Sequence, residues 1–296
     1  MKDFNQKVAV ITGAGSGMGR YLSILLAKAG CNVAICEINA DTLAETGAML
    51  TDYPVKVSTH VLDVADKVAI EDLPESVIKN HGQIDMVFNN AGVTVDCSFE
   101  NMPESDWDWV LDINLHGVIN STRAFLPYLK KRPEAALINT SSIFGMITLP
   151  NQSVYHTAKF ALRGFTECLA KELKGSTVQV HCVHPGHIGT NIVTNARMHS
   201  NNTASNGLQD MMIKLLKIGD TQEEFAEFFR NAGMHPSRAA NIILKGVLKN
   251  RSRIFVGMDA VLMDISQRIL PMHYDKLFPL FTLPLSLIRS KKPINY

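Results

Sequence analysis

Short apolar runs alternate with longer stretches of helical periodicity from residue 7 to about residue 257. This alternation is typical of βαβ units, because two neighbouring parallel strands need a crossover connection that is usually a helix. Most of the runs are continuous stretches of Val, Ile and Ala without polar alternation, as expected for strands covered on both faces. The pattern predicts an α/β fold with a doubly wound, Rossmann-type parallel sheet of seven strands.

The expected boundaries of the strands and helices are the ends of the apolar runs and of the stretches with helical periodicity. Strands are predicted at Lys7–Thr12, Asn32–Glu37, Lys56–Leu62, Met86–Asn89, Ala135–Thr140, Val178–His184 and Arg253–Gly257. Helices are predicted at Met18–Ala29, Ala40–Leu50, Val68–Asn80, Asp106–Lys131, Val154–Lys174, Glu223–Asn231 and Ser237–Asn250. Two helix starts carry capping-box patterns, Ser105 with Asp108 and Thr221 with Glu224.

Composition excludes several classes of protein. Hydrophobic residues make up 46% of the chain, and the formal net charge is +1, so neither a disordered chain nor a nucleic-acid partner is indicated. The five cysteines are scattered without a Cys-x-x-Cys spacing, which favours a reducing, cytoplasmic location and no metal site. No secretory signal is visible, and the uncharged stretch Leu277–Ile288 falls short of the roughly 20 residues that a transmembrane helix needs.

A glycine-rich turn follows the first predicted strand. Its spacing, Gly13-x-x-x-Gly17-x-Gly19, leads directly into a helix, where glycines allow a close backbone approach and free N–H groups face a bound pyrophosphate. Glu37, at the end of the second strand, is an acceptor for the hydroxyl groups of an adenosine ribose. A 2′-phosphate would meet this charge, so NAD is favoured over NADP, although a solvated Glu that merely ends a strand is the alternative.

Polar residues in apolar settings mark a second candidate site. Asn114 falls within the apolar stripe of its helix, so its amide must either bond to backbone groups or hold water and catalytic side chains. Tyr155 and Lys159, in the spacing Tyr-x-x-x-Lys, share one helix face, where the ammonium could lower the pKa of the phenol. The alternative is an exposed Tyr beside a Lys that only packs, but Ser142 follows the end of a predicted strand, where ligands bind in this architecture.

Together these features resemble the short-chain dehydrogenase/reductase family. The matching motifs are Thr12-Gly-x-x-x-Gly-x-Gly19, Asp63, Asn89-Asn90-Ala91-Gly92, Asn114, Ser142, Tyr155-x-x-x-Lys159 and Pro185-Gly186-His187-Ile188-Gly189-Thr190. They follow family order and spacing over residues 7 to about 257. The departures are Met18 in place of a branched aliphatic residue, His184 before Pro185, and His156-Thr157 within the catalytic segment; none removes a reactive group.

The resemblance implies a role for each matching residue. Ser142 would bind the substrate oxygen, Tyr155 would transfer the proton, Lys159 would lower the Tyr155 pKa and bind the nicotinamide ribose, and Asn114 would position a water. Asp63 and Asn90 would contact the adenosine, and Ile188 and Thr190 the carboxamide. The full set expected to bind cofactor is Gly13, Ser16, Gly17, Met18, Gly19, Glu37, Asp63, Val64, Asn90, Ala91, Gly92, Tyr155, Lys159, Pro185, Gly186, Ile188 and Thr190.

These expectations lead to two functional hypotheses. The first is an NAD-dependent enzyme that interconverts a secondary alcohol and a ketone, with Tyr155 as general acid and base. The second is a catalytically idle NAD-binding module for regulation or assembly. A module of that kind needs the glycine turn and Glu37 but not Ser142, Tyr155, Lys159 and Asn114 together, so the enzyme is favoured.

The sequence also predicts the surroundings of the site. Residues 1–257 are expected to form one dinucleotide-binding and catalytic domain with a lid insert at 186–235, because the long polar loop Pro185–Asp220 resembles a mobile cover. Apolar residues predicted to line a pocket for a lipophilic substrate are Val93, Val95, Ile143, Phe144, Met146, Ile147, Met198, Met211, Met212, Leu215, Leu216, Phe225, Phe228 and Phe229. Many of them could instead pack the insert onto the sheet. His187 could touch the substrate, but a loop histidine beside Pro-Gly is expected to be merely solvated.

Two predictions concern association. The helix edge formed by Phe160, Gly164 and Glu167 is expected to face a second subunit in a homodimer or homotetramer, as is common in relatives. Residues 258–296 are expected to form an extension that packs on the same domain. Its apolar segment Leu277–Ile288, followed by Arg289, Lys291 and Lys292, could cover the pocket mouth, which we favour, or make a peripheral membrane contact.

Overall fold

The computed structural model describes residues 1–199 and 222–277 of the chain. Its main sheet has seven strands in the order β3-β2-β1-β4-β6-β7-β9, and each neighbouring pair is parallel. The strands are β1 Val8–Thr12, β2 Asn32–Glu37, β3 Val57–Val61, β4 Met86–Asn89, β6 Ala135–Thr140, β7 Val178–Pro185 and β9 Arg253–Val256. The predicted doubly wound sheet is confirmed, and every strand overlaps its predicted run.

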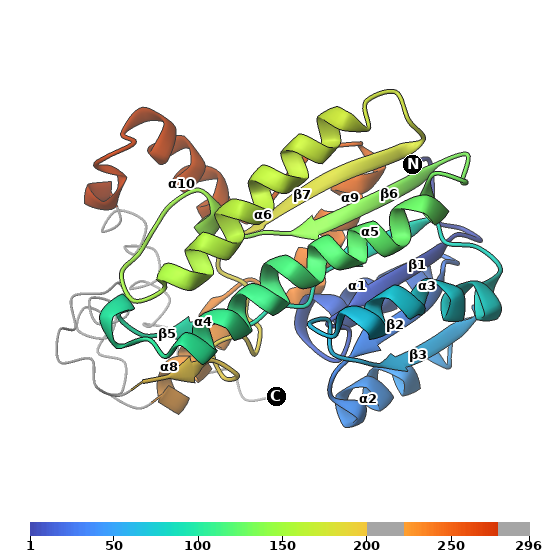
Figure 1. The fold of residues 1–296 in the computed structure, drawn as a ribbon, viewed down its shortest axis with the longest axis horizontal. Coiled ribbons are helices and arrows are strands. Elements are labelled where there is room, and N and C mark those ends of the chain that lie inside the picture. Colours follow the sequence, from blue (N-terminus) through green and yellow to red (C-terminus); the bar gives the residue numbers. More distant parts are fainter. Residues whose placement is uncertain (200–221, 278–296) are drawn as a thin grey trace.

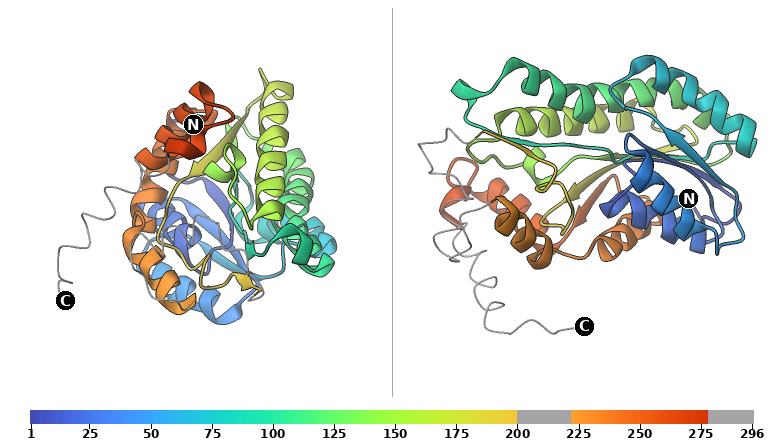
Figure 2. Two further views of the ribbon diagram at one scale, coloured as in Figure 1. Left: turned by 90° about the vertical axis from the view of Figure 1, so that its left-hand side faces the viewer. Right: turned by 90° about the horizontal axis from the view of Figure 1, so that it is seen from below.

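Helices cover both faces of this sheet. They are α1 Gly17–Lys28, α2 Ala40–Leu50, α3 Lys67–His81, α4 Glu104–Leu111, α5 Gly117–Leu129, α6 Ser153–Glu172, α8 Gln222–Ala232, α9 Pro236–Leu248 and α10 Met258–Ile269. α1, α2 and α9 lie on one face of the sheet, and α3, α5 and α6 lie on the other (Figures 1 and 2). The buried side chains of the two groups belong to two separate core clusters. In β1, Ala9 and Ile11 join the first layer whereas Val8 and Val10 join the second, which is why the run is apolar throughout.

The strand order places a crevice at the carboxyl ends of β1 and β4. β1 pairs with β2 on one side and with β4 on the other. The chain leaves β1 through α1 on one face and leaves β4 toward α5 on the opposite face. Because the two connections diverge, they leave room for a ligand between them.

The helix predicted over Asp106–Lys131 has three segments. α4 runs into a π-helical segment, η2 (Asp112–His116), which continues into α5. The helix begins at Glu104, because the Pro103 carbonyl accepts hydrogen bonds from the Asp106 and Trp107 amides at 3.0 and 3.1 Å. The capping box predicted for Ser105 and Asp108 is therefore wrong, since no side chain caps this helix. The second predicted box includes Thr221, which lies outside the described residues.

The connection after β7 contains structure that the sequence did not predict. β8 (Arg197–Met198) pairs with β5 (Val95–Asp96) in a separate, two-stranded parallel sheet. The buried Asp106 carboxylate of α4 binds the Arg197 guanidinium and the His199 imidazole, each at 2.5 Å. This part of the insert is thus tied to α4, and residues 200–221, with Met211, Met212, Leu215 and Leu216, lie outside the described residues.

The chain beyond β9 contacts the carboxyl edge of the sheet. α10 lies beyond that edge (Figure 1), and its Ala260 packs with Ile143 and Met146. Asp259, in the first turn of α10, accepts a hydrogen bond from the His187 amide at 2.5 Å. The predicted tail segment lies almost entirely outside the described residues. Within residues 1–199 and 222–277, no helix is long and apolar enough to cross a membrane.

The predicted subunit edge lies on α6. Phe160 is 38% exposed, and a Cβ atom at Gly164 would have open space around it. Glu167 forms ion pairs with Arg163 at 3.0 Å and with Arg253 at 2.6 Å. This surface leaves room for a second subunit, and association stays a prediction.

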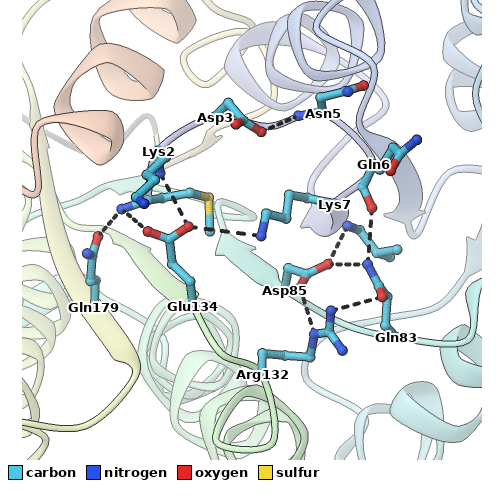
Figure 3. Close-up of polar contacts among 12 residues, drawn as sticks. Lys2, Asp3, Asn5, Gln6, Lys7, Gln83, Asp85, Arg132, Glu134 and Gln179 are labelled. Carbon is cyan, nitrogen blue, oxygen red and sulfur yellow. Dashed lines mark hydrogen bonds and ion pairs between the residues drawn. The ribbon is translucent and has the colours of Figure 1, made fainter.

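Polar contacts join the amino ends of four central strands (Figure 3). The Asp85 carboxylate, which is fully buried, accepts hydrogen bonds from the Val8 amide and the Gln83 side chain, both at 2.8 Å, and pairs with Arg132 at 2.8 Å. Nearby, Glu134 binds the Met1 ammonium group at 3.0 Å. Asp85 thus connects β1, β4 and the turn before β6, and the sequence pattern gave no sign of it.

We predict that Asp85→Ala lowers the free energy of unfolding by about 3 kcal/mol, because the variant leaves a buried amide and a partly buried guanidinium without their acceptor. Urea denaturation measures the change. The matched control is Glu71→Ala, which removes an exposed ion pair with Lys67 and should cost at most about 0.5 kcal/mol. Equal losses in the two variants would contradict this role for Asp85.

Candidate active site

A cavity of about 830 Å³ occupies the crevice at the carboxyl edge of the sheet. It extends from the glycine-rich turn to Met263 of α10. Every residue predicted for catalysis or cofactor binding lines this cavity except Gly19 and Asn114, which lie just behind its wall. The topology therefore brings the two motif groups, distant in sequence, into one site.

The glycine-rich turn brings β1 close to the segment after β4. Gly13 adopts a left-handed φ of 66°, and a Cβ atom there would lie 2.8 Å from the Ala91 Cα. A Cβ atom at Gly19 would overlap the Gly13 carbonyl. The Ser16 side chain makes no capping bond at the start of α1, so the first amides of this helix remain available to an anion.

Glu37 lies at the end of the cavity that contains the glycine-rich turn. Its carboxylate accepts hydrogen bonds from the Gly15 amide at 3.1 Å and the Ile38 amide at 2.9 Å. A nearby cation, Arg20, was missed by the sequence analysis because it lies one turn into the helix. Its guanidinium binds Glu45 at 2.7 Å and Thr46 at 3.0 Å, and also binds the Gly15 carbonyl. At this end the cavity lining therefore includes two acidic residues, Glu37 and Asp63, whereas Arg20 does not line the cavity.

The segment after β4 carries an unused acceptor. The Thr12 hydroxyl accepts hydrogen bonds from the amides of Asn90 and Ala91, at 3.0 and 3.1 Å. The Asn90 side chain donates to the Thr12 carbonyl at 3.3 Å, while its Oδ1 atom is buried without a partner among the described residues. A buried acceptor of this kind calls for a donor from a ligand. With the glycine cradle and Glu37, the residues present fit a dinucleotide.

Tyr155, Lys159 and Ser142 meet at the opposite end of the cavity. The Lys159 ammonium lies 5.5 Å from the centre of the Tyr155 ring and donates a hydrogen bond to the Thr140 carbonyl at 3.0 Å. Burial raises the pKa of Tyr155 to about 12, against a smaller lowering by a hydrogen bond to Ser142. Burial also lowers the pKa of Lys159 to about 8. In this structure desolvation therefore sets the direction of the Tyr155 pKa, and the predicted lowering by Lys159 is not among its causes.

Asn114 is fully buried in η2 and binds one backbone segment. Its Nδ2 atom donates to the Val93 carbonyl at 2.9 Å, and its Oδ1 atom accepts from the Val93 amide at 3.2 Å. A Cβ atom at Gly92 would lie 2.7 Å from that Oδ1 atom. Of the two alternatives, the side chain makes the backbone bonds, and its predicted role in holding water stays a prediction.

A buried chain of polar side chains behind the cavity was also missed. Ser121 donates to Asn89 at 2.7 Å, Asn89 to Asn139 at 2.9 Å, and Asn139 to Thr166 at 3.0 Å. The chain links α5, β4, β6 and α6 beneath the site. Asparagines at the ends of otherwise apolar runs were the available signal, since a buried amide needs partners.

The remaining wall is mostly apolar. Val93, Ile143, Phe144, Ile147, Met198 and Phe229 line the cavity as predicted. Val95 and Met146 do not line it; each is buried in an apolar cluster beside the cavity. Phe228 is partly buried away from the cavity, and the Phe225 side chain lies outside the described part. Among the described residues, Lys159 is the one Lys or Arg in the lining, which also includes His187.

His187 is a further correction. Its Nε2 atom donates to the Phe229 carbonyl at 2.7 Å, and its ring contacts the Phe229 ring with a centroid distance of 4.0 Å. Desolvation lowers its pKa. The prediction that His187 is merely solvated is wrong, because α8 and α10 cover part of this turn and leave the residue half-buried in the cavity lining. Its contact with substrate, the alternative, stays a prediction.

Comparison with known proteins shows the family to which the sequence pattern belongs. Residues 7–201 match the family described as short chain dehydrogenase. A Mycobacterium tuberculosis protein that carries the name oxidoreductase SadH is 36% identical over 281 residues, which are 94% of this chain and 95% of that protein. The 3-oxoacyl-(acyl-carrier-protein) reductase FabG of Thermotoga maritima is 38% identical over 184 residues, or 62% of this chain and 75% of FabG.

Solved structures share the fold. A short-chain dehydrogenase/reductase from Burkholderia phymatum, in complex with NAD, has a TM-score of 0.79 and 22% identity over 100% of both chains. A metagenomic short-chain oxidoreductase in complex with NADP has a TM-score of 0.59 and 28% identity, and the match covers 62% of this chain and 83% of that one. Since the two structures hold different cofactors, the choice between them must come from the residues of this chain.

We predict that Gly19→Ala weakens NADH binding by roughly tenfold or more, because overpacking at the turn typically costs about 1–3 kcal/mol and moves α1 from the cradle. Fluorescence titration with NADH measures the dissociation constant. Gly47→Ala is the matched control, because a Cβ atom there meets ordinary contact with Thr59 at 3.5 Å. If NADH binds both variants as it binds wild type, the cradle is assigned incorrectly.

Proposed function

Because the chain belongs to the short-chain dehydrogenase/reductase family of oxidoreductases, we propose that it interconverts a secondary alcohol and a ketone with NAD(H), using Tyr155 as general acid and base. The observation that carries the proposal is the meeting of Ser142, Tyr155 and Lys159 at one end of a cavity that has Glu37 at its other end. A site that only binds the cofactor would need Glu37 and the glycine-rich turn, but not Ser142, Tyr155 and Lys159 together.

The proposed roles follow from protonation and position. When bound, the nicotinamide supplies or accepts the hydride. With a pKa raised to about 12, Tyr155 carries its proton at neutral pH and can give it to a ketone oxygen that Ser142 also holds. The Lys159 ammonium, whose pKa is lowered to about 8, then stabilises the phenolate through its charge. In alcohol oxidation the same proton moves in the opposite direction.

We predict that Tyr155→Phe lowers kcat by a factor on the order of 10²–10⁴, because the proton donor is lost, while NADH binding stays within about twofold. Steady-state turnover and fluorescence titration give the two values. Tyr53→Phe serves as control, because Tyr53 packs against the core cluster on the sheet face covered by α1, α2 and α9. Unchanged turnover in Tyr155→Phe would exclude Tyr155 as the acid, and absence of turnover in wild type would favour an idle binding module.

The proposed preference for NAD rests on Glu37 and on the contacts of Arg20. Glu37 lines the cavity and already accepts backbone hydrogen bonds, so an added phosphate would meet a fixed negative charge. Arg20, the nearby cation, is held in an ion pair with Glu45 at 2.7 Å. Its charge is therefore largely compensated where a 2′-phosphate would need it.

We predict that kcat/KM with NAD exceeds that with NADP, and that Glu37→Gln reduces the ratio by roughly tenfold, since removal of one repelling charge is worth about 1–2 kcal/mol at such a site. Glu75→Gln, on the exposed surface of α3, should leave the ratio unchanged. Comparable values for the two cofactors in wild type would contradict the assignment.

The proposed substrate is lipophilic. Apolar surface is contributed to the cavity that Tyr155 lines by Val93, Ile143, Phe144, Ile147, Met198 and Phe229. The Phe144 and Tyr155 rings lie edge to face with centroids 6.2 Å apart, so the substrate carbon chain would lie against an aromatic wall. Among described residues the lining offers no Arg, and its single Lys is engaged with Thr140, so no cation is placed to bind a substrate carboxylate or phosphate.

We predict that bulky apolar ketones exceed small polar ones in kcat/KM, because burying apolar area contributes about 25 cal/mol per Å². A turnover screen of ketones of graded size measures this. Phe144→Ser should reduce kcat/KM for bulky ketones several-fold and leave the smallest ones nearly unchanged. Better turnover of small polar ketones by wild type would contradict the proposed substrate class.

A further inference from the structure

Two histidines flank the loop that carries Ser142. We call residues 142–149 the substrate loop; it starts at Ser142, contains the 3₁₀ turn η3 (Ile143–Gly145), and places Phe144 and Leu149 in the cavity lining. His156 and His184 do not line the cavity, yet both are buried directly behind this loop. The proposed reaction assigns no role to either.

His184 holds the first residue of the substrate loop. It lies in β7, is 0% exposed, and its Nδ1 atom donates to the Ser142 carbonyl at 3.1 Å. The ring stacks on Phe255 of β9, with centroids 5.4 Å apart and an interplanar angle of 30°. Since a carbonyl oxygen can only accept, Nδ1 must carry the proton, and strand and stacked ring together fix where that proton points.

His156 holds the middle and the end of the same loop. It follows Tyr155 in α6 and is 5% exposed. Its Nδ1 atom donates to the Phe144 carbonyl at 2.9 Å, and its Nε2 atom accepts from the Leu149 amide at 3.0 Å. The neutral imidazole alone can donate from one nitrogen and accept at the other. A single ring therefore connects two wall residues to the helix turn that carries Tyr155.

Both rings are kept in this neutral form. Burial lowers the pKa of His156, and lowers that of His184 to about 4. The two side chains thus act at neutral pH as fixed hydrogen-bonding groups, not as charges. Other contacts also hold the region: Ser141 donates to the Lys159 carbonyl at 2.9 Å, and Arg163 to the Gly145 carbonyl at 3.3 Å. The histidines differ in that they bind the backbone of the substrate loop itself, at Ser142, Phe144 and Leu149, which line the cavity.

We propose that His184 and His156 are positioning residues of the site, with separate tasks. His184 fixes the backbone of Ser142 and so aims its hydroxyl at the substrate oxygen beside Tyr155. His156 fixes the backbone of Phe144 and Leu149 and so sets the apolar wall against which the substrate body lies. The inference rests on the proposed function, and it assigns orientation of the reacting oxygen to one residue and substrate fit to the other.

The test for His184 uses a variant that keeps the stacked ring and removes the donor. In His184→Phe, kcat should fall about tenfold or more, while the dissociation constant for NADH stays within twofold. His184→Asn, whose Nδ2 atom takes the place of Nδ1, should restore kcat to within about threefold of wild type. If His184→Phe does not fold, His184→Leu takes its place in the comparison.

His181 provides a matched control on the same strand. It is also 0% exposed, and its Nδ1 atom donates to the Arg251 carbonyl at 2.7 Å, away from the cavity. His181→Phe removes an equivalent buried bond, so it should lower the thermal midpoint as much as His184→Phe but leave kcat nearly unchanged. Equal loss of kcat in both variants, or failure of His184→Asn to restore it, would overturn the role of His184.

The test for His156 separates KM from kcat. His156→Leu should raise KM for a bulky apolar ketone about tenfold and change kcat less than threefold, while the KM of the smallest turned-over ketone stays within twofold. Equal effects on both ketones, or an effect on kcat alone, would overturn the role. Wild-type turnover is measured first: if wild type binds NADH but reduces no ketone, the proposed function fails and this inference with it, whereas active wild type with unaffected variants refutes this inference alone.

Discussion

The close approach of two backbone segments, the turn at Gly13 and the segment at Ala91, is the constraint on which the site depends. At a separation that leaves no room for a Cβ atom at Gly13, the Thr12 hydroxyl can accept from two successive amides after β4. Because the connections leave β1 and β4 on opposite faces of the sheet, this contact forms the floor of the crevice. The same contact places the Asn90 Oδ1 atom, which has no partner among the described residues, beside the turn that leads into α1.

Burial is the second constraint, and it determines the protonation state of the groups around the reacting end. Tyr155 and Lys159 are both removed from water, so the phenol is held in its protonated form and the ammonium becomes easier to deprotonate. The same desolvation keeps His156 and His184 neutral. A site of this kind relies on fixed hydrogen bonds to backbone carbonyls, and low solvent access makes each of those bonds stronger than it would be in water.

Much of this arrangement could be predicted because it has a local signature. Continuous Val and Ile runs such as Val8–Thr12 predict buried strands, and the spacing of Gly13, Gly17 and Gly19 predicts an anion-binding turn. The substrate wall was predicted only in part: Phe144 and Ile147 line it, whereas Val95 forms a strand that points into a buried cluster. A shift of one residue along the chain decides whether an apolar side chain faces the cavity or a buried cluster. A run of apolar residues does not indicate which of them faces the cavity.

Other features have no local signature at all. The π-helical segment at Asn114 leaves the apolar stripe nearly unchanged, so a continuous helix was predicted. Asp85 and His187 are polar residues next to turns, where solvation is the usual expectation. Elements distant in the chain bury Asp85 fully and His187 partly. Arg20 was overlooked because it lies one turn into α1, beyond the glycine-rich turn, and its partner Glu45 lies in another helix. In each case tertiary contacts, which follow from topology, decided the environment.

The central claim is that NADH bound in this cavity gives its hydride to the carbonyl carbon of a ketone. Transfer of an isotope label from the cofactor to the product tests this claim most directly. The protein is incubated with NADH deuterated at C4 of the nicotinamide, on each face in turn, and with an apolar ketone. We expect mass spectrometry to find one deuterium on the carbinol carbon of the alcohol, with one of the two labelled cofactors only, while the hydroxyl proton comes from solvent through Tyr155. Alcohol without deuterium from either cofactor, or no alcohol from any ketone in the presence of bound NADH, would contradict the account.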